Sequence, residues 1–540
     1  MFRVLATALC ATALLLACSK APEPAAPLAS APPGSANASA PATAKAAIAW
    51  VKPVGTDVDA IFAQAKAANK PVYLYWGAVW CPPCNQIKAT VFNRPDFIER
   101  SQAFIPVYLD GDTPGAQKLG TRFKVRGYPT MILFRPDGSE MTRLPGEVDA
   151  ARYMQVLAAG MAAASPIKES LATALGERAS SLGADAWRLL AFYSWDTDEA
   201  QLVPQKDVAA TLQKLAAACP PEQKDAATRL RLQALAAAAK NKANGVDTAV
   251  ALQQVQAALQ DANVARENFD VLLYRGDDLV GMLTPAGSAA RASLVGEWNT
   301  ALDRLAQDAS LSKSDRLSAV YAKLQLAKLG LPKEPRPKLA DALVAQARAA
   351  AQQADRETTD RYERQALIPS AADMLSEVGL LDESDAMLKA ELPHAVSPYY
   401  HMLVLSANAK TRGDKPAALD WAERAYNDSQ GPATRLQWGG GYVNKLIDLA
   451  PQDAARIEKA ASAVIAELEP VPETFYERNQ RVLERMGKRL HAWNAKGSHA
   501  AVLKKLGAQL DGVCAKLPQG DPARDACAGA FKPQPPGKSA

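Results

Sequence analysis

The sequence has few aromatic residues and very few histidines. Phe, Trp and Tyr make up 6% of the 540 residues, and there are 4 histidines. Few aromatics together with abundant alanine favour a largely helical protein. The histidines lie far from the cysteine pair near the N-terminus, and we interpret each as a surface or core residue. They are His394, His401, His491 and His499.

An excess of charge and long apolar runs are also missing. Lys and Arg number 62 against 57 Asp and Glu, which gives a net charge of +5. Because no basic block or basic–aromatic alternation occurs, nucleic acid is not an expected partner. The apolar run from Val4 to Leu16 is short for a membrane-spanning helix. The length exceeds that of one ordinary hydrophobic core, so two or more domains are expected.

The N-terminus reads as a targeting segment. Arg3 followed by the apolar run predicts a secretion signal over residues 1–17. The stretch Leu15-Leu16-Ala17-Cys18 resembles the bacterial lipoprotein signal, in which the cysteine becomes the lipidated first residue. This resemblance implies a lipid anchor on Cys18 in the periplasm, and Ser19 resembles sorting to the outer membrane. The alternative is an ordinary signal peptide that is cut nearby, with Cys18 incidental.

The seven cysteines divide by position. Cys10 leaves with the signal, and Cys18 is the expected lipidation site. Cys514 and Cys527 are close in sequence, which is compatible with a structural disulfide in an oxidising compartment. Cys219 is left over, and we interpret it as a small buried apolar residue.

The remaining cysteines stand in the motif Trp80-Cys81-Pro82-Pro83-Cys84. The apolar, aromatic segment 72–76 before it predicts a strand, and segment 85–91 after it predicts a helix. At a helix N-terminus, unpaired backbone N–H groups and the helix dipole favour a thiolate on the first cysteine. The second cysteine is then near enough to form a disulfide with the first.

The features that surround this motif, taken in order, are stronger evidence for a fold than the motif alone. A lone Cys-x-x-Cys is equally typical of half a zinc site. Over residues 48–163, however, the sequence resembles the thioredoxin superfamily. This resemblance implies an α/β thioredoxin fold that needs no metal and no cofactor beyond the redox-active disulfide. The further features are a strand over 104–110, Gly127-Tyr128-Pro129-Thr130, a strand over 131–134, a turn over 135–138 and Gly146 before a closing helix.

The resemblance also implies roles for individual residues. Cys81 is the attacking cysteine and Cys84 the resolving one in thiol–disulfide exchange. Pro129 matches the family's cis-proline. The residues expected to contact substrate are Trp80, Tyr128, Pro129 and Thr130.

Two positions depart from the family's pattern. Tyr75 stands where a buried acid is frequent, and Val79 stands where an acidic residue is common. The buried acid is thought to help the resolving cysteine lose its proton, so its absence puts the rate of that step in doubt. The helix dipole alone contributes up to about 2 kcal/mol, which would bring the pKa of Cys81 from roughly 8.5 towards 7.

The rest of the chain contains two segments without core-forming residues and one long helical region. Residues 18–47 form an Ala, Pro and Ser tether, and residues 532–540 a polar, Pro-rich tail. The sequence pattern of residues 166–531 predicts a succession of helices with little strand. Gly379 and Gly413 are 34 residues apart, the period of tetratricopeptide-type helical hairpins. The pattern suggests an α-solenoid, with an irregular helical domain as the alternative.

The run Trp438-Gly439-Gly440-Gly441-Tyr442 invites comparison with a phosphate-binding loop. It lacks the Gly-Lys-Ser/Thr ending and a preceding strand. We therefore expect a loop or a helix break there, because glycine is a poor helix former.

The leading hypothesis is a tethered thiol–disulfide oxidoreductase of the bacterial cell envelope. It would reduce disulfides of envelope proteins with electrons from another dithiol protein, while the helical domain binds partner or substrate. The reductase direction follows from the likeness of Phe92 to Phe97 to periplasmic reductase domains. The competing hypothesis is a helical scaffold in which the Cys81–Cys84 pair is structural.

Overall fold

The computed structural model describes residues 47–53, 57–125, 127–146, 148–195, 202–243, 245–331, 338–469 and 475–532. The expected signal peptide, Cys10, the lipidation site Cys18 and the tether lie outside these residues, apart from Ala47 at the tether's end. The expected tail also lies outside them, apart from Lys532. The chain from Ala47 onward packs as one compact unit.

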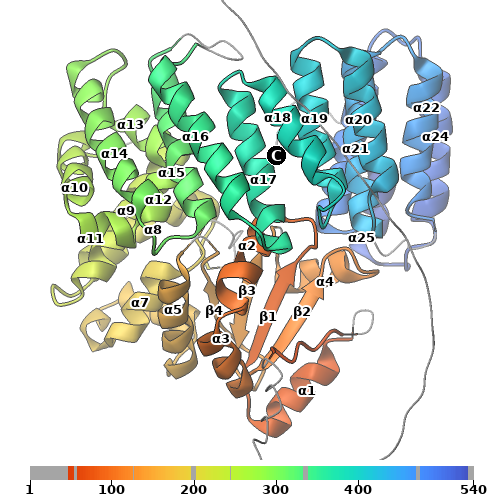
Figure 1. Cartoon of the computed structure of the whole chain (residues 1–540). Coiled ribbons are helices and arrows are strands. Elements are labelled where there is room, and N and C mark those ends of the chain that lie inside the picture. Colours follow the sequence, from red (N-terminus) through yellow and green to blue (C-terminus); the bar gives the residue numbers. More distant parts are fainter. Residues whose placement is uncertain are drawn as a thin grey trace, which may run out of the picture. The chain divides into compact units, whose positions relative to one another are not determined.

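A four-stranded mixed sheet forms the core of the α/β part. The strand order is β2-β1-β3-β4, with β1 parallel to β2 and β3 antiparallel to both β1 and β4 (Figure 1). This arrangement confirms the predicted α/β fold. The strands are β1 (Val72–Gly77), β2 (Ile105–Asp110), β3 (Thr130–Phe134) and β4 (Glu140–Leu144).

Helices cover both faces of this sheet. Alternate residues of a strand point to opposite faces, so Leu74 packs in one hydrophobic cluster with α1 and α4. Tyr73 and Tyr75 pack in another cluster with α5. The elements are α1 (Asp59–Ala68), α2 (Pro82–Ile87), the π-helical η1 (Lys88–Phe92), α3 (Pro95–Arg100), η2 (Ser101–Ala103), α4 (Ala116–Phe123) and α5 (Ala150–Ala162).

The remaining described residues form helices and connections, as predicted for this region. The first group is α6 (Ile167–Ala174), η3 (Ala179–Ser181), α7 (Ala184–Phe192), η4 (Gln205–Asp207), α8 (Val208–Ala218), α9 (Lys224–Lys240), α10 (Thr248–Gln260), α11 (Ala262–Glu267), α12 (Phe269–Tyr274), α13 (Gly276–Leu283), α14 (Ala289–Gln307), α15 (Lys313–Lys328) and α16 (Asp341–Glu357). The second is α17 (Arg361–Glu377), α18 (Leu381–Glu391), α19 (Pro398–Thr411), α20 (Lys415–Asp428), α21 (Pro432–Leu449), α22 (Ala454–Ala466), α23 (Glu477–Trp493), α24 (Ala500–Cys514) and α25 (Pro522–Gly529).

The 34-residue glycine spacing marks the turns of successive helical hairpins. Gly379 follows α17 with φ +85°, and Gly413 follows α19 with φ +79°. Glycine adopts this left-handed conformation without steric cost, which is why it ends helices. Helix α17 then packs on α18, and α19 on α20 (Figure 1).

The expected break at Gly439 to Gly441 is wrong, because these residues lie inside the continuous helix α21. The reason is close packing. A Cβ on Gly439 would stand 2.6 Å from Val464 of α22, and one on Gly440 would stand 2.6 Å from Val482 of α23. The glycines therefore let neighbouring helices approach α21, and this packing outweighs their low helix propensity.

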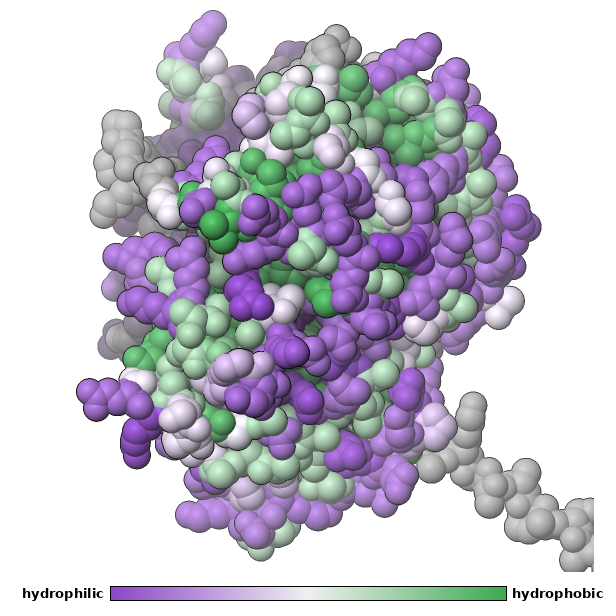
Figure 2. Space-filling view, turned by 90° about the vertical axis from the view of Figure 1, so that its left-hand side faces the viewer, coloured by the Kyte–Doolittle hydropathy of each residue, from purple (hydrophilic) through white to green (hydrophobic). Residues whose placement is uncertain are grey.

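The sheet and the helices share one hydrophobic core. The cluster that contains Tyr73 and Met131 of the sheet continues into Trp187 and Leu190 of α7. The face in Figure 2 is mostly hydrophilic, with hydrophobic residues interspersed. Few large apolar side chains are exposed among the described residues, for example Val79 and Val250. Among the described residues, no helix combines the length and apolarity needed to cross a membrane.

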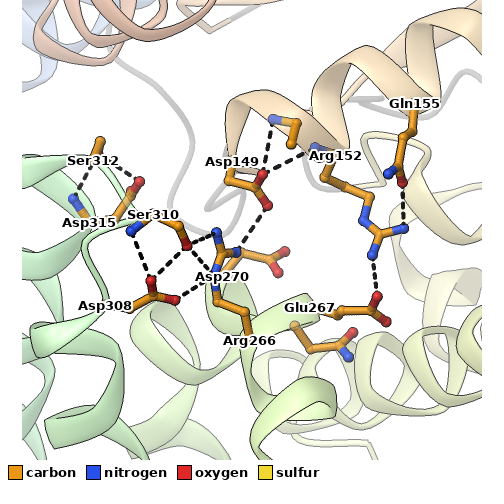
Figure 3. A network of polar contacts seen from close by, with 12 residues as sticks. Asp149, Arg152, Gln155, Arg266, Glu267, Asp270, Asp308, Ser310, Ser312 and Asp315 are labelled. Carbon is orange, nitrogen blue, oxygen red and sulfur yellow. Dashed lines mark hydrogen bonds and ion pairs between the residues drawn. The ribbon is translucent and has the colours of Figure 1, made fainter.

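A polar network joins α5 to helices of the all-helical part (Figure 3). Arg266 donates 3.0 Å to Asp149, which caps α5, and 2.7 Å to Asp308. Arg152 of α5 pairs with Glu267. Because these groups are only partly exposed, their pairing holds the two parts in register more effectively than fully exposed pairs would.

Candidate thiol–disulfide site

The cysteine pair stands where β1 passes into α2. Cys81 and Cys84 are joined by a disulfide. Cys81 is the N-cap of α2, and its Sγ accepts a hydrogen bond from the backbone N–H of Cys84 at 3.3 Å. Pro82 and Pro83 fill the first turn, where a missing N–H costs nothing. This geometry places Cys81 where the helix dipole stabilises a thiolate.

Both cysteines are buried, because the helical part covers this end of the α/β part. Cys81 is 2% exposed and Cys84 0%. Helix α17 packs on α2 (Figure 1). Gln365 of α17 donates to the carbonyl oxygen of Trp80 at 3.4 Å and accepts from the backbone N–H of Ser397 at 3.0 Å.

The ring of Trp80 is enclosed by side chains that the sequence did not single out for this site. Tyr400 stacks on it with ring centroids 5.9 Å apart, and Trp438 meets it edge-on at 4.9 Å. The guanidinium of Arg478 lies 5.1 Å from the centroids of both Trp80 and Tyr128. The surface beside Cys81 that the family resemblance assigns to substrate is therefore occupied by the chain's own helices.

Asp112 links Trp80 to the helical part. Its carboxylate accepts from Trp80 Nε1 at 3.2 Å and from Thr434 Oγ1 at 2.5 Å. The pKa of Asp112 is raised to about 7, chiefly by burial and in part by the nearby charge of Asp110, against the opposing effect of the hydrogen bonds from Thr434 and Trp80. Gly431 has φ +85° and no Cβ, which leaves room for the Asp112 side chain.

We expect Asp112 to make the protein less stable as pH rises. Its pKa is raised from 3.8 to about 7 on folding, so its favourable contribution is complete below about pH 4 and is lost as pH passes about 7. Urea unfolding of wild type and Asp112→Asn at about pH 5 and about pH 8 measures this effect. Wild type should lose more stability over the interval than the variant. Parallel losses would refute the assignment.

Tyr75 cannot replace the acid that the family often has at its position. Burial raises the pKa of Tyr75 well above its usual value, so the hydroxyl stays neutral. Among the described residues, this hydroxyl has no hydrogen-bond partner, and the ring stacks on Tyr108 with centroids 5.1 Å apart. Nearby Lys88 lies 5.8 Å from the Tyr108 centroid, and burial lowers its pKa. The resolving cysteine thus has no carboxylate from this strand position.

The Tyr128–Pro129 peptide bond is cis. The Tyr128 ring stacks on Trp76 with centroids 5.8 Å apart, and its hydroxyl accepts from Gln117 at 2.9 Å. Thr130 begins β3, is buried and donates to the carbonyl oxygen of Gly127 at 3.1 Å. The Tyr128 and Thr130 side chains are thus engaged within the protein.

A groove opens beside the proline residues of the site. Its volume is about 190 Å³. Pro83, Pro129 and Gly146 line one side, and residues of the helical part, including Trp195 and Asp270, line the other. The sequence could not reveal the second side, because those residues lie far from the motif along the chain.

The other three cysteines that the structure describes take no part in this pair. Cys514 and Cys527 form a disulfide between α24 and α25. Cys219 is buried, and burial raises the pKa of its thiol to about 11, which makes it a poor nucleophile. In the part of the chain that the structure describes, no group of three or more His, Cys, Asp or Glu side chains is placed to hold a metal ion.

Comparison with known proteins agrees with this geometry. The family model described as "Thioredoxin-like domain" matches residues 58–160. The thioredoxin of Mycobacterium bovis is 32% identical over 100 residues, which cover 18% of this chain and 82% of that protein. The chain belongs to the thioredoxin family. Residues 58–160, which the family model matches, contain the Cys81–Cys84 pair and the four strands of the sheet.

Thioredoxin-like segments of larger proteins match as well. The thiol:disulfide interchange protein DsbD of Pseudomonas fluorescens is 36% identical over 96 residues, or 17% of this chain and 16% of that protein. The DsbD of Neisseria meningitidis serogroup B is 29% identical over 89 residues. The chain thus spans about a sixth of the length of these relatives. A solved structure named DsbH oxidoreductase matches at 19% identity and a TM-score of 0.18, covering 21% of this chain and 88% of that chain.

Proposed function

We propose that this protein is a thiol–disulfide oxidoreductase whose reacting groups are Cys81 and Cys84. The observation that carries the proposal is the disulfide at the N-terminus of α2, where the first thiol gains the helix-dipole stabilisation that a nucleophile needs. The thioredoxin-like part, proposed as residues 48–163, supplies the chemistry. The helical part, proposed as residues 166–531, selects what reaches it.

The proposed direction is reduction of substrate disulfides in the bacterial cell envelope. The resemblance of residues 92–97 to reductase domains supports this direction. Relatives named thiol:disulfide interchange proteins support the exchange chemistry itself. Electrons would come from an upstream dithiol protein. Residues 1–17 would direct secretion, and a lipid on Cys18 would anchor the protein at the outer membrane.

A second candidate function is a helical scaffold whose Cys81–Cys84 bond is only structural. The burial of both cysteines supports it, since Cys81 is 2% exposed and Cys84 0%. A buried disulfide resists attack by external thiols because exchange requires access to a sulfur atom.

Replacing the resolving cysteine distinguishes these functions. In Cys84→Ser, the mixed disulfide formed by Cys81 cannot be released by an internal thiol. We expect non-reducing electrophoresis and mass spectrometry to show covalent adducts on Cys81 when the reduced variant meets substrate disulfides.

The matched control is Cys81→Ser, which should form no adduct because Cys84 lies inside α2 and lacks the N-cap position that favours a thiolate. Equal adduct formation by both variants would reverse the assigned roles. Absence of adducts from Cys84→Ser, with the protein folded, would favour the scaffold.

A further inference from the structure

Helix α23 carries its basic residues on one face. An α-helix turns by about 100° per residue, so five cations of α23 fall within an arc of about 100°. Near one end of this face Lys488 and Arg485 are exposed, whereas Arg478 at the other end is half-buried. The face therefore runs from solvent into the protein. Its residues, which we call the α23 basic face, are Arg478, Arg481, Arg485, Lys488 and Arg489.

Three cations of the α23 basic face have no acidic partner in the part of the chain that the structure describes. Arg481 pairs with Glu477 of the same helix, and Arg489 pairs with Asp448 of α21. Grouped positive charges that lack such pairs attract a negatively charged partner and speed its association. The three are Arg478, Arg485 and Lys488.

A cavity of about 220 Å³ adjoins this face. Arg485 of α23 and Lys445 of α21 supply its charges, and Trp438, Tyr442 and Val482 supply apolar surface. Among the described residues that line it, none is acidic. A carboxylate that enters the cavity would therefore meet two cations and no repelling charge from the lining.

Lys445 carries a positive charge that its surroundings compensate only in part. Its Nζ donates 2.6 Å to Ser406 Oγ of α19. The pKa of Lys445 is lowered to about 8, chiefly by burial and in part by the nearby charge of Lys410, against the opposing effect of Asp448. At pH 7 the lysine is still mainly protonated, so a carboxylate in the cavity would stabilise it.

The cavity and the α23 basic face both reach the tryptophan of the cysteine motif. Trp438, which lines the cavity, meets Trp80 edge-on with ring centroids 4.9 Å apart. The Arg478 guanidinium lies 5.1 Å from the centroids of Trp80 and Tyr128. A ligand in the cavity would thus contact a side chain that covers Trp80, the residue directly before Cys81.

The shape of this site favours a polypeptide over a membrane surface. The cavity is a recess among α19, α20, α21 and α23. Its volume of about 220 Å³ lies below the range of roughly 300–1,000 Å³ for pockets that hold drug-sized ligands. A flat bilayer surface does not enter such a recess, whereas a single acidic side chain of a polypeptide does.

We propose that the α23 basic face and the adjoining cavity form the docking site for an acidic polypeptide segment of the protein that exchanges thiols with this one. This inference rests on the proposed function, to which it adds the chemistry of the partner. One carboxylate of the segment enters the cavity between Lys445 and Arg485, and another pairs with Lys488. Because much of this surface is open to solvent, salt weakens the attraction.

Binding of an acidic peptide to the full chain, with the Cys81–Cys84 pair oxidised, tests the site. The probe is a fluorescein-labelled peptide of alternating glutamate and glycine, read by fluorescence anisotropy. We expect saturable binding that weakens at least about threefold between about 50 mM and 300 mM salt. Arg485→Glu should weaken binding at least about tenfold, because it replaces an attracting charge by a repelling one. Lys488→Glu should act in the same direction.

The matched control is Arg356→Glu, which makes the same change of charge at an exposed position in the last turn of α16. It should alter binding less than about twofold. Equal binding by wild type and Arg485→Glu would overturn the inference. So would a lack of saturable binding, or stronger binding to vesicles of anionic phospholipid than to the peptide. None of these results bears on the proposed function, because the disulfide takes no part in the measurement.

A second measurement connects the docking site to the exchange reaction. Reduced Cys84→Ser should form adducts on Cys81 at least about tenfold faster with a disulfide-bearing acidic peptide than with its lysine counterpart. Adding Arg485→Glu should remove this preference. Equal rates for the two peptides would overturn the inference and leave the proposed function intact. Absence of adducts with both peptides would refute the proposed function, and with it the partner's role in exchange, whatever the peptide binding.

Discussion

Asp270→Ala is expected to lower the free energy of unfolding by about 3–5 kcal/mol. The substitution leaves the Arg229 guanidinium, whose side chain is 4% exposed, without the carboxylate that pairs with it. An unpaired buried charge keeps its desolvation cost and loses its compensation. Urea or guanidinium unfolding of the full chain measures the change.

Two further variants make this expectation specific. Arg229→Met combined with Asp270→Leu removes both charges and should recover most of the lost stability. Asp185→Ala removes an exposed pair with Arg188, 3.6 Å apart, and should cost less than about 1 kcal/mol. If Asp270→Ala costs no more than Asp185→Ala, the buried ion pair does not stabilise the protein more than an exposed one.

Removal of the Cys514–Cys527 disulfide should have the second large effect. The two cysteines are 13 residues apart, and closing a loop of this size stabilises a protein by about 3 kcal/mol in the chain-entropy model. The double variant Cys514→Ser, Cys527→Ser should therefore unfold at lower denaturant concentration, and hydrogen exchange should speed up first in α24 and α25.

The region that this disulfide ties down also reaches the thioredoxin-like part. Asp521, at the start of α25, accepts from the Tyr476 hydroxyl at 2.7 Å and lies 3.7 Å from Lys118 Nζ of α4. Cys219→Ala is the control, since Cys219 forms no disulfide. Equal unfolding midpoints for the double variant and wild type would show that the disulfide contributes no stability.

The sequence predicted the α/β part because its signals are local. The strand that became β1 is a continuous apolar and aromatic run, and the cysteine motif follows it directly. Pro82 and Pro83 fit only the first turn of a helix. Gly379 and Gly413, which end helices with positive φ, likewise signalled hairpin turns through their own conformational preference.

The cover over the site could not be predicted in this way. Gln365 is separated from Trp80 by 285 residues. A glutamine is also an ordinary residue on any helix surface, so its type did not point to the site. The same holds for Arg478 and Trp438, whose contact with Trp80 depends on how the helices stack. The glycine run in α21 was misread for a related reason. Its propensity cost is about 1 kcal/mol per glycine, and only the tertiary packing explains why the helix persists.

The most direct test of the central claim is a redox titration of the Cys81–Cys84 pair in the folded, full chain. Dithiothreitol and glutathione buffers set the potential, and alkylation with mass spectrometry counts the thiols. We predict reversible titration near thioredoxin's value of about −270 mV, as a reductase requires. A pair that stays oxidised in excess dithiothreitol until the protein unfolds would contradict the claim and identify a structural disulfide.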